Sequence, residues 1–293
     1  MVLKHIFQRT LTNNIYNSWL QFKAWYRYIV PGQSSIKVMP PSEYNLVFED
    51  RFNGDRIDSS EWRFGQPWGN FHTEQLWWYW PETDSCAKTS EDGLKLSLCL
   101  NPRVFVKNQL PEWKRSKKLP EVWTGSWCAG LISTKKAYQF GWFEAEIMIP
   151  TDFMQWSAFW LAGQDSWPPE IDIFETYYAD EQLWVKPNVH FGNAGTWKDG
   201  KRDMGQPLIP LANPADRWIK YACHWTEDWI RFYYDGYLVY EMTIPMALKQ
   251  NAQEQYIILN NGCENPAELG FDPAESGMLV RNLKVYQHKN WID

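Results

Sequence analysis

The sequence is most informative at Pro168-Pro-Glu-Ile-Asp-Ile-Phe-Glu-Thr-Tyr-Tyr178. The density of Ile, Phe and Tyr in this stretch is typical of a β-strand. Side chains alternate along a strand, so Glu170 and Asp172 share one face, whereas Glu175 falls on the other. One extra residue between Asp172 and Glu175, a β-bulge, would return Glu175 to the first face. We therefore predict a bulged strand that presents three carboxylates to one groove.

Three carboxylates on a core-like strand are costly, because each charge loses hydration and repels the others. Such a cluster is explained more readily by chemistry than by stability. Two carboxylates about 5–5.5 Å apart are the machinery of a retaining glycosidase, one as nucleophile and one as general acid/base. The outer pair, Glu170 and Glu175, are the candidates, and Asp172 between them would set their protonation. The alternative is a solvated acidic face on an ordinary strand.

Six motifs in a fixed order carry a family resemblance. They are Phe48-Glu-Asp-Arg-Phe-Asn-Gly54, Gly141-Trp-Phe-Glu-Ala-Glu-Ile147, Trp156-Ser-Ala-Phe-Trp160, the acidic stretch, Asn188-Val-His-Phe-Gly192, and Trp225 to Gly236. With them, the chain from about Tyr44 to Lys289 resembles glycoside hydrolase family 16. The match is to the bulged Glu-x-Asp-x-x-Glu form of its laminarinase, agarase and carrageenase branches.

The resemblance implies an all-β fold, a jelly-roll sandwich of two antiparallel sheets of the concanavalin-like lectin and glucanase type. Short strands, frequent turns and the absence of strand–helix alternation favour the same class independently. Asp235-Gly236 is typical of a hairpin turn between two alternating strands, and Glu91-Asp-Gly93 of another. The domain is expected to cover residues 43–293, after an N-terminal extension of residues 1–42.

The activity implied by the resemblance is endo-hydrolysis of a β-linked polysaccharide, of β-glucan or galactan type, with retention of configuration. Glu170 would be the nucleophile, Asp172 its electrostatic partner and Glu175 the general acid/base. Two alternatives stay open: a transglycosylase using the same site, and a non-catalytic, lectin-like carbohydrate-binding domain. The intact acidic triad argues against the second, because a binding module has no need of it.

Further residues are expected to contact substrate. Trp156 and Trp160 have the same parity on a predicted strand and therefore share a face. In the family the corresponding tryptophans face the sugars beside the point of cleavage. His190 is either a structural histidine or a contact to substrate or Asp172, and the resemblance supports the contact. Asn70 and Asn260 fall in stretches that border the cleft in relatives.

Composition sets the outer limits. The chain has 293 residues, 44% of them hydrophobic, enough for one large domain. Its 20 tryptophans suit a carbohydrate cleft as well as an aromatic core. The net charge of −6 argues against a nucleic-acid partner. We expect a monomer whose partner is its polysaccharide substrate.

Neither a metal nor an organic cofactor is expected. The five cysteines are Cys86, Cys99, Cys128, Cys223 and Cys263. Their spacings match no metal site or redox pair, so buried thiols are predicted and a disulfide cannot be assigned. Relatives that bind a structural calcium usually carry an Asp in the closing strand, where this chain has Arg281. A cation at that position would repel the ion.

Residues 1–30 contain no acid and four basic residues, and their apolar residues recur at three- and four-residue steps. This pattern predicts a basic amphipathic helix. It would either pack on the domain, which we favour, or lie on a membrane surface. No apolar run is long enough to span a membrane, and no secretory signal is evident. The substrate class suggests an extracellular or periplasmic location, but the sequence shows no evident secretory signal that would support it.

Asn101 to Gly125 is expected to form a long basic loop. Such a loop could be a rim beside the cleft that favours an acidic polysaccharide, or an ordinary solvated surface segment.

Overall fold

The structure is a computed structural model of the whole chain. It describes residues 38–291 apart from positions 70–75, 77, 111, 113–114, 116, 118, 151–154, 180–181, 193–200, 203–208, 211–216 and 264–275. Near the N-terminus it describes Trp19 and Phe22, which are both helical and half exposed. The predicted N-terminal helix otherwise lies outside the described residues, as does Asn70. Among the described residues, no helix is long and apolar enough to cross a membrane.

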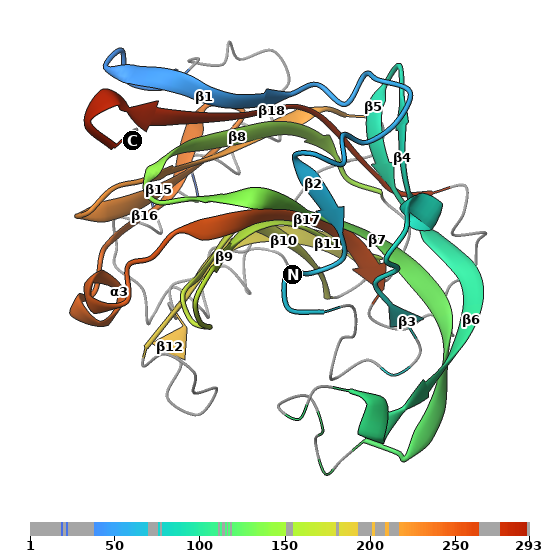
Figure 1. Cartoon of the computed structure of the whole chain (residues 1–293). Coiled ribbons are helices and arrows are strands. Elements are labelled where there is room, and N and C mark those ends of the chain that lie inside the picture. Colours follow the sequence, from blue (N-terminus) through green and yellow to red (C-terminus); the bar gives the residue numbers. More distant parts are fainter. Residues whose placement is uncertain are drawn as a thin grey trace.

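Two layers of β-sheet form the domain, as predicted (Figure 1). The first, sheet A, has eight strands. In spatial order these are β16 (Tyr237–Thr243), β15 (Trp229–Tyr234), β14 (Ile219–Trp225), β8 (Gly141–Met148), β18 (Met278–His288), β5 (Gly93–Leu96) and β4 (Ala87–Ser90), with β1 (Tyr44–Asp50) also paired to β18.

The second layer, sheet B, has ten strands and carries the acidic stretch. In spatial order these are β12 (Lys201–Arg202), β11 (Gln182–Phe191), β10 (Glu170–Ala179), β9 (Gln155–Gly163), β17 (Gln255–Cys263), β7 (Val122–Tyr138) and β2 (Trp62–Phe64). Off this path, β13 (Ile209–Pro210) pairs with β11, and β3 (Trp78–Tyr79) and β6 (Leu98–Val106) pair with β7. Every named pair is antiparallel except β3 with β7.

The named helical segments within the domain are short. They are α3 (Met246–Gln250), η1 (Asp84–Cys86), η2 (Lys107–Gln109) and η5 (Lys289–Trp291).

The main core lies between the two sheets, where alternate side chains of each strand meet. One cluster of fully buried residues contains Phe143 and Ala145 of β8 together with Ile171, Ile173 and Phe174 of β10. Burying each large side chain stabilises the fold by about 1.5–3 kcal/mol. The neighbours Ile173 and Phe174 both enter this core, which regular alternation forbids and a bulge allows.

The predicted hairpins are confirmed. β15 and β16 are joined by Asp235-Gly236, with φ angles of 49° and 82°. Positive φ at both positions is the requirement of a tight turn whose twist matches the strands. β4 and β5 pair around Glu91-Asp92, with Ser90 opposite Gly93.

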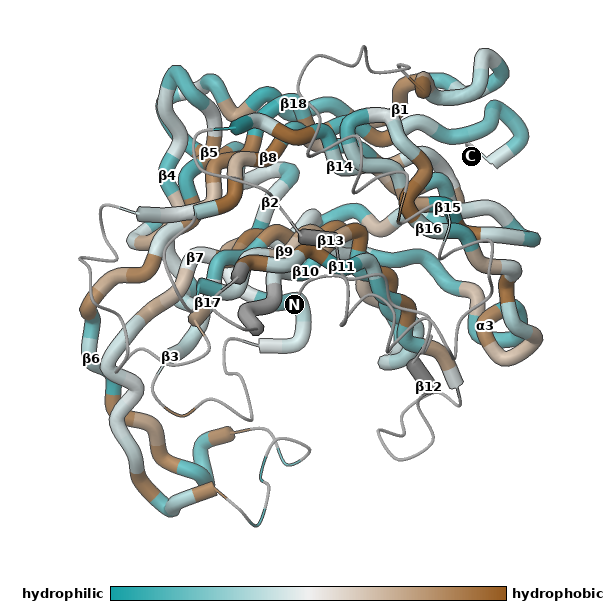
Figure 2. The backbone as a smooth tube through the Cα atoms, turned by 180° about the vertical axis from the view of Figure 1, so that it is seen from behind, coloured by the Kyte–Doolittle hydropathy of each residue, from teal (hydrophilic) through white to brown (hydrophobic). Residues whose placement is uncertain are grey.

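The predicted long loop at 101–125 is wrong in its extent. β6 and β7 pair from Leu98 opposite Ala129 to Val106 opposite Val122, so only residues 107–121 connect them. This hairpin, which we call the arm, curves away from the two layers and carries hydrophobic as well as hydrophilic residues (Figure 2). The residues that pair in this hairpin lie 16 to 31 positions apart in the sequence, a pairing that local composition does not indicate.

Candidate active site

The bulge in β10 is present at the predicted place. Its register with β11 shifts between Asp172 and Glu175, and its register with β9 shifts between Asp172 and Phe174. Because Ile173 and Phe174 occupy the core, Glu175 returns to the face that Glu170 and Asp172 share. The three acids therefore lie in one row on the outer face of sheet B.

A row of polar side chains on β11 faces this acidic row. Glu170 is registered with His190, Asp172 with Asn188 and Glu175 with Lys186. Lys186 Nζ lies 3.6 Å from Glu175 Oε2, and His190 Nε2 lies 3.2 Å from Glu170 Oε1. In these two rows of described side chains, three acids face one lysine, so the acids outnumber the permanent cations.

Glu170 is held from two sides. The Trp167 indole Nε1 donates a hydrogen bond to Glu170 Oε2 at 2.9 Å, while His190 lies at its other oxygen. Burial, and then the charge of Asp172, raise the pKa of Glu170 to about 8, although His190 and the Trp167 hydrogen bond act in the opposite direction. The free site therefore keeps a proton at neutral pH that an isolated glutamate would lose.

His190 contacts both acids at this end of the row. Its Nε2 lies 3.6 Å from Asp172 Oδ2 and 2.8 Å from Asn188 Nδ2. The oxygen of Asn188 accepts a hydrogen bond from the Val189 backbone, so its Nδ2 is the group turned to the ring. His190 is 7% exposed and Asp172 2%, which fits the predicted contact between them.

Strand β9 lies on the other side of β10 from β11, and its outward side chains are next to the acids. Ala162 is registered with Glu170, Trp160 with Asp172 and Ala158 with Glu175. Small, buried side chains therefore lie beside the two outer acids. The single large neighbour is placed beside the central acid.

Trp156, Trp160 and Asn260 come together on this face. Trp160 Nε1 donates to Asn260 Oδ1 at 2.8 Å, and Asn260 Nδ2 donates to the Trp156 carbonyl at 3.2 Å. Both indoles are partly buried against a second apolar cluster that includes Trp78. Trp68 meets Trp160 edge-on at 6.2 Å between ring centroids. The tryptophans are thus fixed with part of their surface accessible.

Three residues of the site were not among the predicted ones: Trp167, Lys186 and Asn188. Asn188 and Lys186 stand two and four positions before His190, so strand alternation puts them on its face. That signal was available once the two strands were known to pair. Trp167 belongs to the loop before β10, and no spacing rule places a loop side chain.

Among the described residues, two groups place three metal-ligating atoms within 4.8 Å of one another. One is Glu170, Asp172 and His190, which is also the donor set of an acid–base site. The other is a group of cysteines far from these acids in the sequence. Arg281, expected to disfavour calcium, pairs with Glu146 at 2.8 Å and lies over the Trp218 ring.

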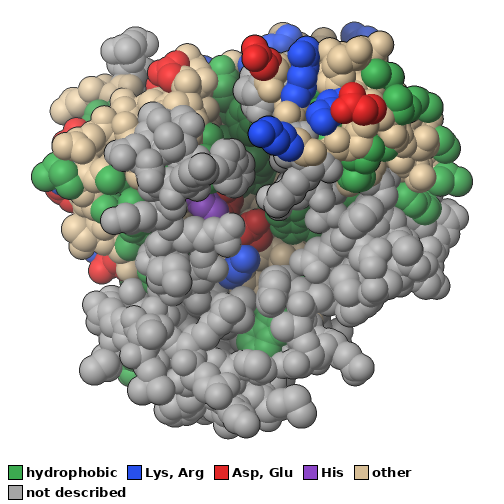
Figure 3. Space-filling model, turned by 90° about the horizontal axis from the view of Figure 1, so that it is seen from below, with side chains coloured by type: hydrophobic (Ala, Val, Ile, Leu, Met, Phe, Trp, Pro, Cys, Tyr) green, Lys and Arg blue, Asp and Glu red, His purple; other side chains and the backbone are tan. Residues whose placement is uncertain are grey.

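Viewed from below, acidic and histidine side chains lie together in a recess near the centre of the face, beside a basic side chain (Figure 3). A β-sandwich whose accessible face holds one buried and two partly exposed acids beside partly exposed tryptophans has the features of a carbohydrate-active enzyme.

Residues 66–260 match the profile of Glycosyl hydrolases family 16, and the chain therefore belongs to this family. Over 235 residues it is 25% identical to the glucan endo-1,3-beta-glucosidase A1 of Niallia circulans, which covers 73% of this chain and 32% of that protein. Over 163 residues it is 30% identical to the endo-1,3-1,4-beta-glycanase ExsH of Rhizobium meliloti (strain 1021), covering 54% and 33%. The chain thus spans about a third of the length of these relatives.

The fold is likewise shared with solved structures. The crystal structure of SCLam, described as a non-specific endo-beta-1,3(4)-glucanase, superposes with a TM-score of 0.64 at 20% identity. The match covers 92% of this chain and 99% of the other. This likeness confirms the predicted jelly-roll sandwich.

Proposed function

We propose that this protein is an endo-acting hydrolase of a β-1,3- or mixed-linked β-glucan that retains the configuration of the anomeric carbon. The observation that carries the proposal is the bulged row of Glu170, Asp172 and Glu175 facing His190 and Lys186. The substrate class is supported by the names of the two curated relatives, which are endo-glucanases or endo-glycanases.

In the first step, ionised Glu170 attacks the anomeric carbon and forms a glycosyl-enzyme ester. Glu175 gives its proton to the departing glycosidic oxygen, so the leaving sugar departs as an alcohol. Glu170 holds a proton in the free site, and His190 and Asp172 lie where they can take it. Charge developing on Glu175 is stabilised by Lys186.

In the second step, Glu175 acts as general base. It removes a proton from water, whose oxygen attacks the anomeric carbon and releases Glu170 as a carboxylate. Two inversions at one carbon give net retention. Glu175 ends protonated, as it began.

The accessible surfaces of Trp156 and Trp160 are proposed to stack on sugar rings next to the scissile bond. Asn260 holds the Trp160 indole through its side-chain oxygen and the Trp156 backbone through its amide nitrogen, and the fixed Trp160 ring reduces the entropy lost when a glycan binds. Trp160 stands directly beside Asp172 and is the better placed of the two.

The test is digestion of laminarin, lichenan, agarose, carrageenan and bacterial exopolysaccharides by the purified chain. We expect oligosaccharides from laminarin or lichenan, with the β-anomer appearing first in proton NMR spectra. An initial α-anomer would rule out retention. Oligosaccharide binding without any product would identify a lectin-like domain, and longer products formed with acceptor sugars would identify a transglycosylase.

The role of Glu175 is tested by Glu175→Ala with added azide. Azide needs no general base, so it should restore part of the lost turnover and yield a β-glycosyl azide. Failure of azide to restore turnover, with an activated substrate that needs no acid, would remove Glu175 from the acid/base role.

A further inference from the structure

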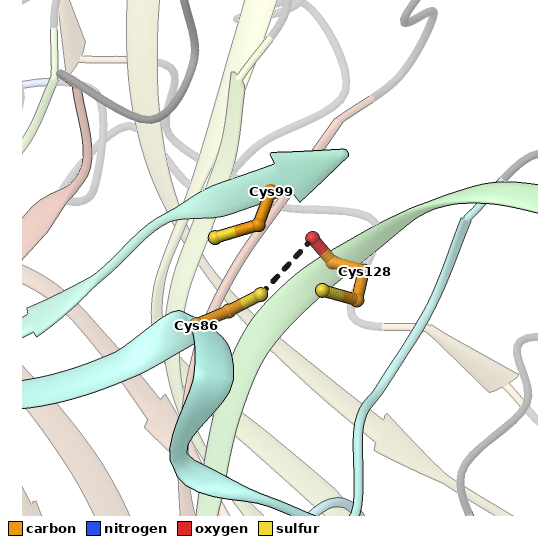
Figure 4. A group of neighbouring side chains, drawn as sticks. All are labelled: Cys86, Cys99 and Cys128. Carbon is orange, nitrogen blue, oxygen red and sulfur yellow. Dashed lines mark hydrogen bonds between the residues drawn. The ribbon is translucent and has the colours of Figure 1, made fainter. Parts of the chain in front are cut away.

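Cys86, Cys99 and Cys128 gather at one point although 13 and 29 residues separate them in the sequence. Each pair of their Sγ atoms lies within 4.8 Å, and the three thiols are free. They come from η1, β6 and β7 and point toward one another (Figure 4). Cys99 and Cys128 are directly opposed in the β6–β7 register.

The backbone around this thiol cluster holds its three elements in close contact. Ser97 N donates to the Cys86 carbonyl at 3.0 Å, and Gly130 N donates to the Ser97 carbonyl at 2.8 Å. A Cβ on Gly130 would lie 2.3 Å from the Cys86 carbonyl oxygen, so a glycine is required there. The thiols are therefore positioned by packed strands rather than by one adjustable loop.

The thiol cluster is mostly buried from solvent. Cys86 and Cys128 are fully buried, whereas Cys99 is partly exposed and leaves one side accessible. Tyr79 and Phe105 pack against the cluster. The Ser85 hydroxyl lies 3.9 Å from Cys86 Sγ and 4.0 Å from Cys128 Sγ, so one oxygen donor borders the sulfur atoms.

We propose that Cys86, Cys99 and Cys128 form a binding site for one thiophilic divalent cation of the zinc class. Zinc binds thiolates at about 2.3 Å, which in tetrahedral geometry separates the sulfur atoms by roughly 3.8 Å. The cluster reaches that spacing by contracting by about 1 Å or less. Ser85 or a water at the open side of Cys99 would supply the fourth ligand.

Binding converts three thiols into thiolates and releases three protons, so affinity must rise with pH. A site of three thiolates selects soft or borderline cations over calcium or magnesium, which prefer oxygen. Its place in the fold suggests a structural role. The cluster lies where β6 and β7 leave the sandwich, so a bound ion would tie the base of the arm to η1.

The experiment uses the full chain, purified reduced and metal-free under anaerobic conditions. Titration with Co(II) should reach saturation at one equivalent, with a thiolate-to-cobalt charge-transfer band that Zn(II) then removes. Zn(II) should also raise the melting temperature, because the folded state brings the three thiols together and binds the ion more tightly than the unfolded chain does. Saturation without a charge-transfer band, or no saturation at one equivalent, would overturn the site.

Cys99→Ser is the decisive variant, because Cys99 is partly exposed and tolerates a hydroxyl best. It should weaken Zn(II) binding by more than about 100-fold, since loss of a supporting partner alone costs 10–100-fold. Cys223→Ala, in the core between the sheets, is the control and should bind as the wild type does. Equal affinity in Cys99→Ser would contradict the proposal, as would a disulfide between two of the three cysteines in protein alkylated during cell lysis.

Discussion

Strands β8 and β10 carry the same short pattern, an acid, an apolar residue and a second acid, but their surroundings differ. On β8, Glu144 pairs with Lys220 at 3.3 Å and Glu146 with Arg281 at 2.8 Å. Each of these two acids of β8 thus has its own cation. The Trp142 indole also donates to Glu144 Oε2 at 2.9 Å.

On β10 the corresponding acids, Glu170 and Asp172, meet His190 in place of a lysine or arginine. An indole again donates to the first acid, here from Trp167 at 2.9 Å. Among the described ion pairs, the difference is that the partner of these two β10 acids is a histidine, which carries no permanent positive charge. Burial and repulsion then raise the pKa of Glu170 into the range where a proton can be moved at neutral pH.

The comparison shows that the acid pattern alone does not define an active site. Acids that are each paired with a cation stabilise a sheet. Acids that outnumber the cations repel one another, which raises their pKa values toward the range needed for proton transfer. The partner strand makes the difference, and partner strands are chosen by long-range pairing.

The largest expected contrast is between Glu170→Gln and Glu144→Gln. The first removes the proposed nucleophile and should lower kcat/KM by roughly 1,000-fold or more, with the fold intact. The second removes the charge of buried Glu144, which pairs with the partly exposed Lys220, and should cost about 1.5–3 kcal/mol of unfolding free energy while leaving activity near wild type. The contrast is measured by the rates of both variants on laminarin and by their thermal unfolding. Equal activity of the two variants would contradict the assignment of Glu170 as nucleophile.

The second expected effect concerns pH. If Glu170 acts ionised, kcat/KM should rise as the pH increases through an acid limb well above pH 4.5, toward about 8. Asp172→Asn removes a repelling charge, so the pKa of Glu170 should fall and the limb should move to lower pH. An acid limb that does not move to lower pH would show that it does not report Glu170, and a decline of wild-type activity through this range would instead make Glu170 the proton donor.

The three acids and their bulge could be predicted from the sequence, because the alternation of side chains along a strand is a local rule. Glu175 can share a face with Glu170 and Asp172 only if one extra residue is inserted between Asp172 and Glu175. Lys186 and Trp167 could not be predicted in this way. Lys186 acts here because β11 lies beside β10, and Trp167 because the loop before β10 folds back over Glu170. Neither arrangement can be predicted from a few consecutive residues.

The arm and the thiol cluster were missed for a related reason. Pro102 lies where the β6–β7 register shifts, between Leu100 and Arg103, and its presence in a basic stretch is typical of a loop. The cysteine spacings match no compact ligand motif, since the cluster forms only after β6, β7 and η1 pack. Both features depend on the pairing of strands that are distant in the sequence, which local patterns do not predict.

A smaller contrast is expected between the two indoles that donate to acids. Trp167→Phe removes the hydrogen bond that lowers the pKa of Glu170, so the acid limb should move to higher pH. A bond to a charged group is worth about 1.5–3 kcal/mol, which corresponds to a loss of about tenfold or more in kcat/KM at pH 6. Trp142→Phe removes the matching bond on sheet A and should leave the pH profile unchanged. Identical profiles for all three proteins would show that Trp167 does not act through Glu170.

The last and smallest effect is on stability, and it follows from the same excess of negative charge on β10. Between about pH 4.5 and 8 the folded protein holds a proton on Glu170 that the unfolded chain has released. The free energy of unfolding contributed by this group is therefore fully present below pH 4.5 and is lost as the pH rises through 8. Glu170→Gln cannot ionise, and every other titrating group is retained. Its melting temperature relative to wild type should increase steadily from pH 5 to pH 8. A difference that stays constant or shrinks over this range would mean that Glu170 ionises in the folded protein as easily as in water.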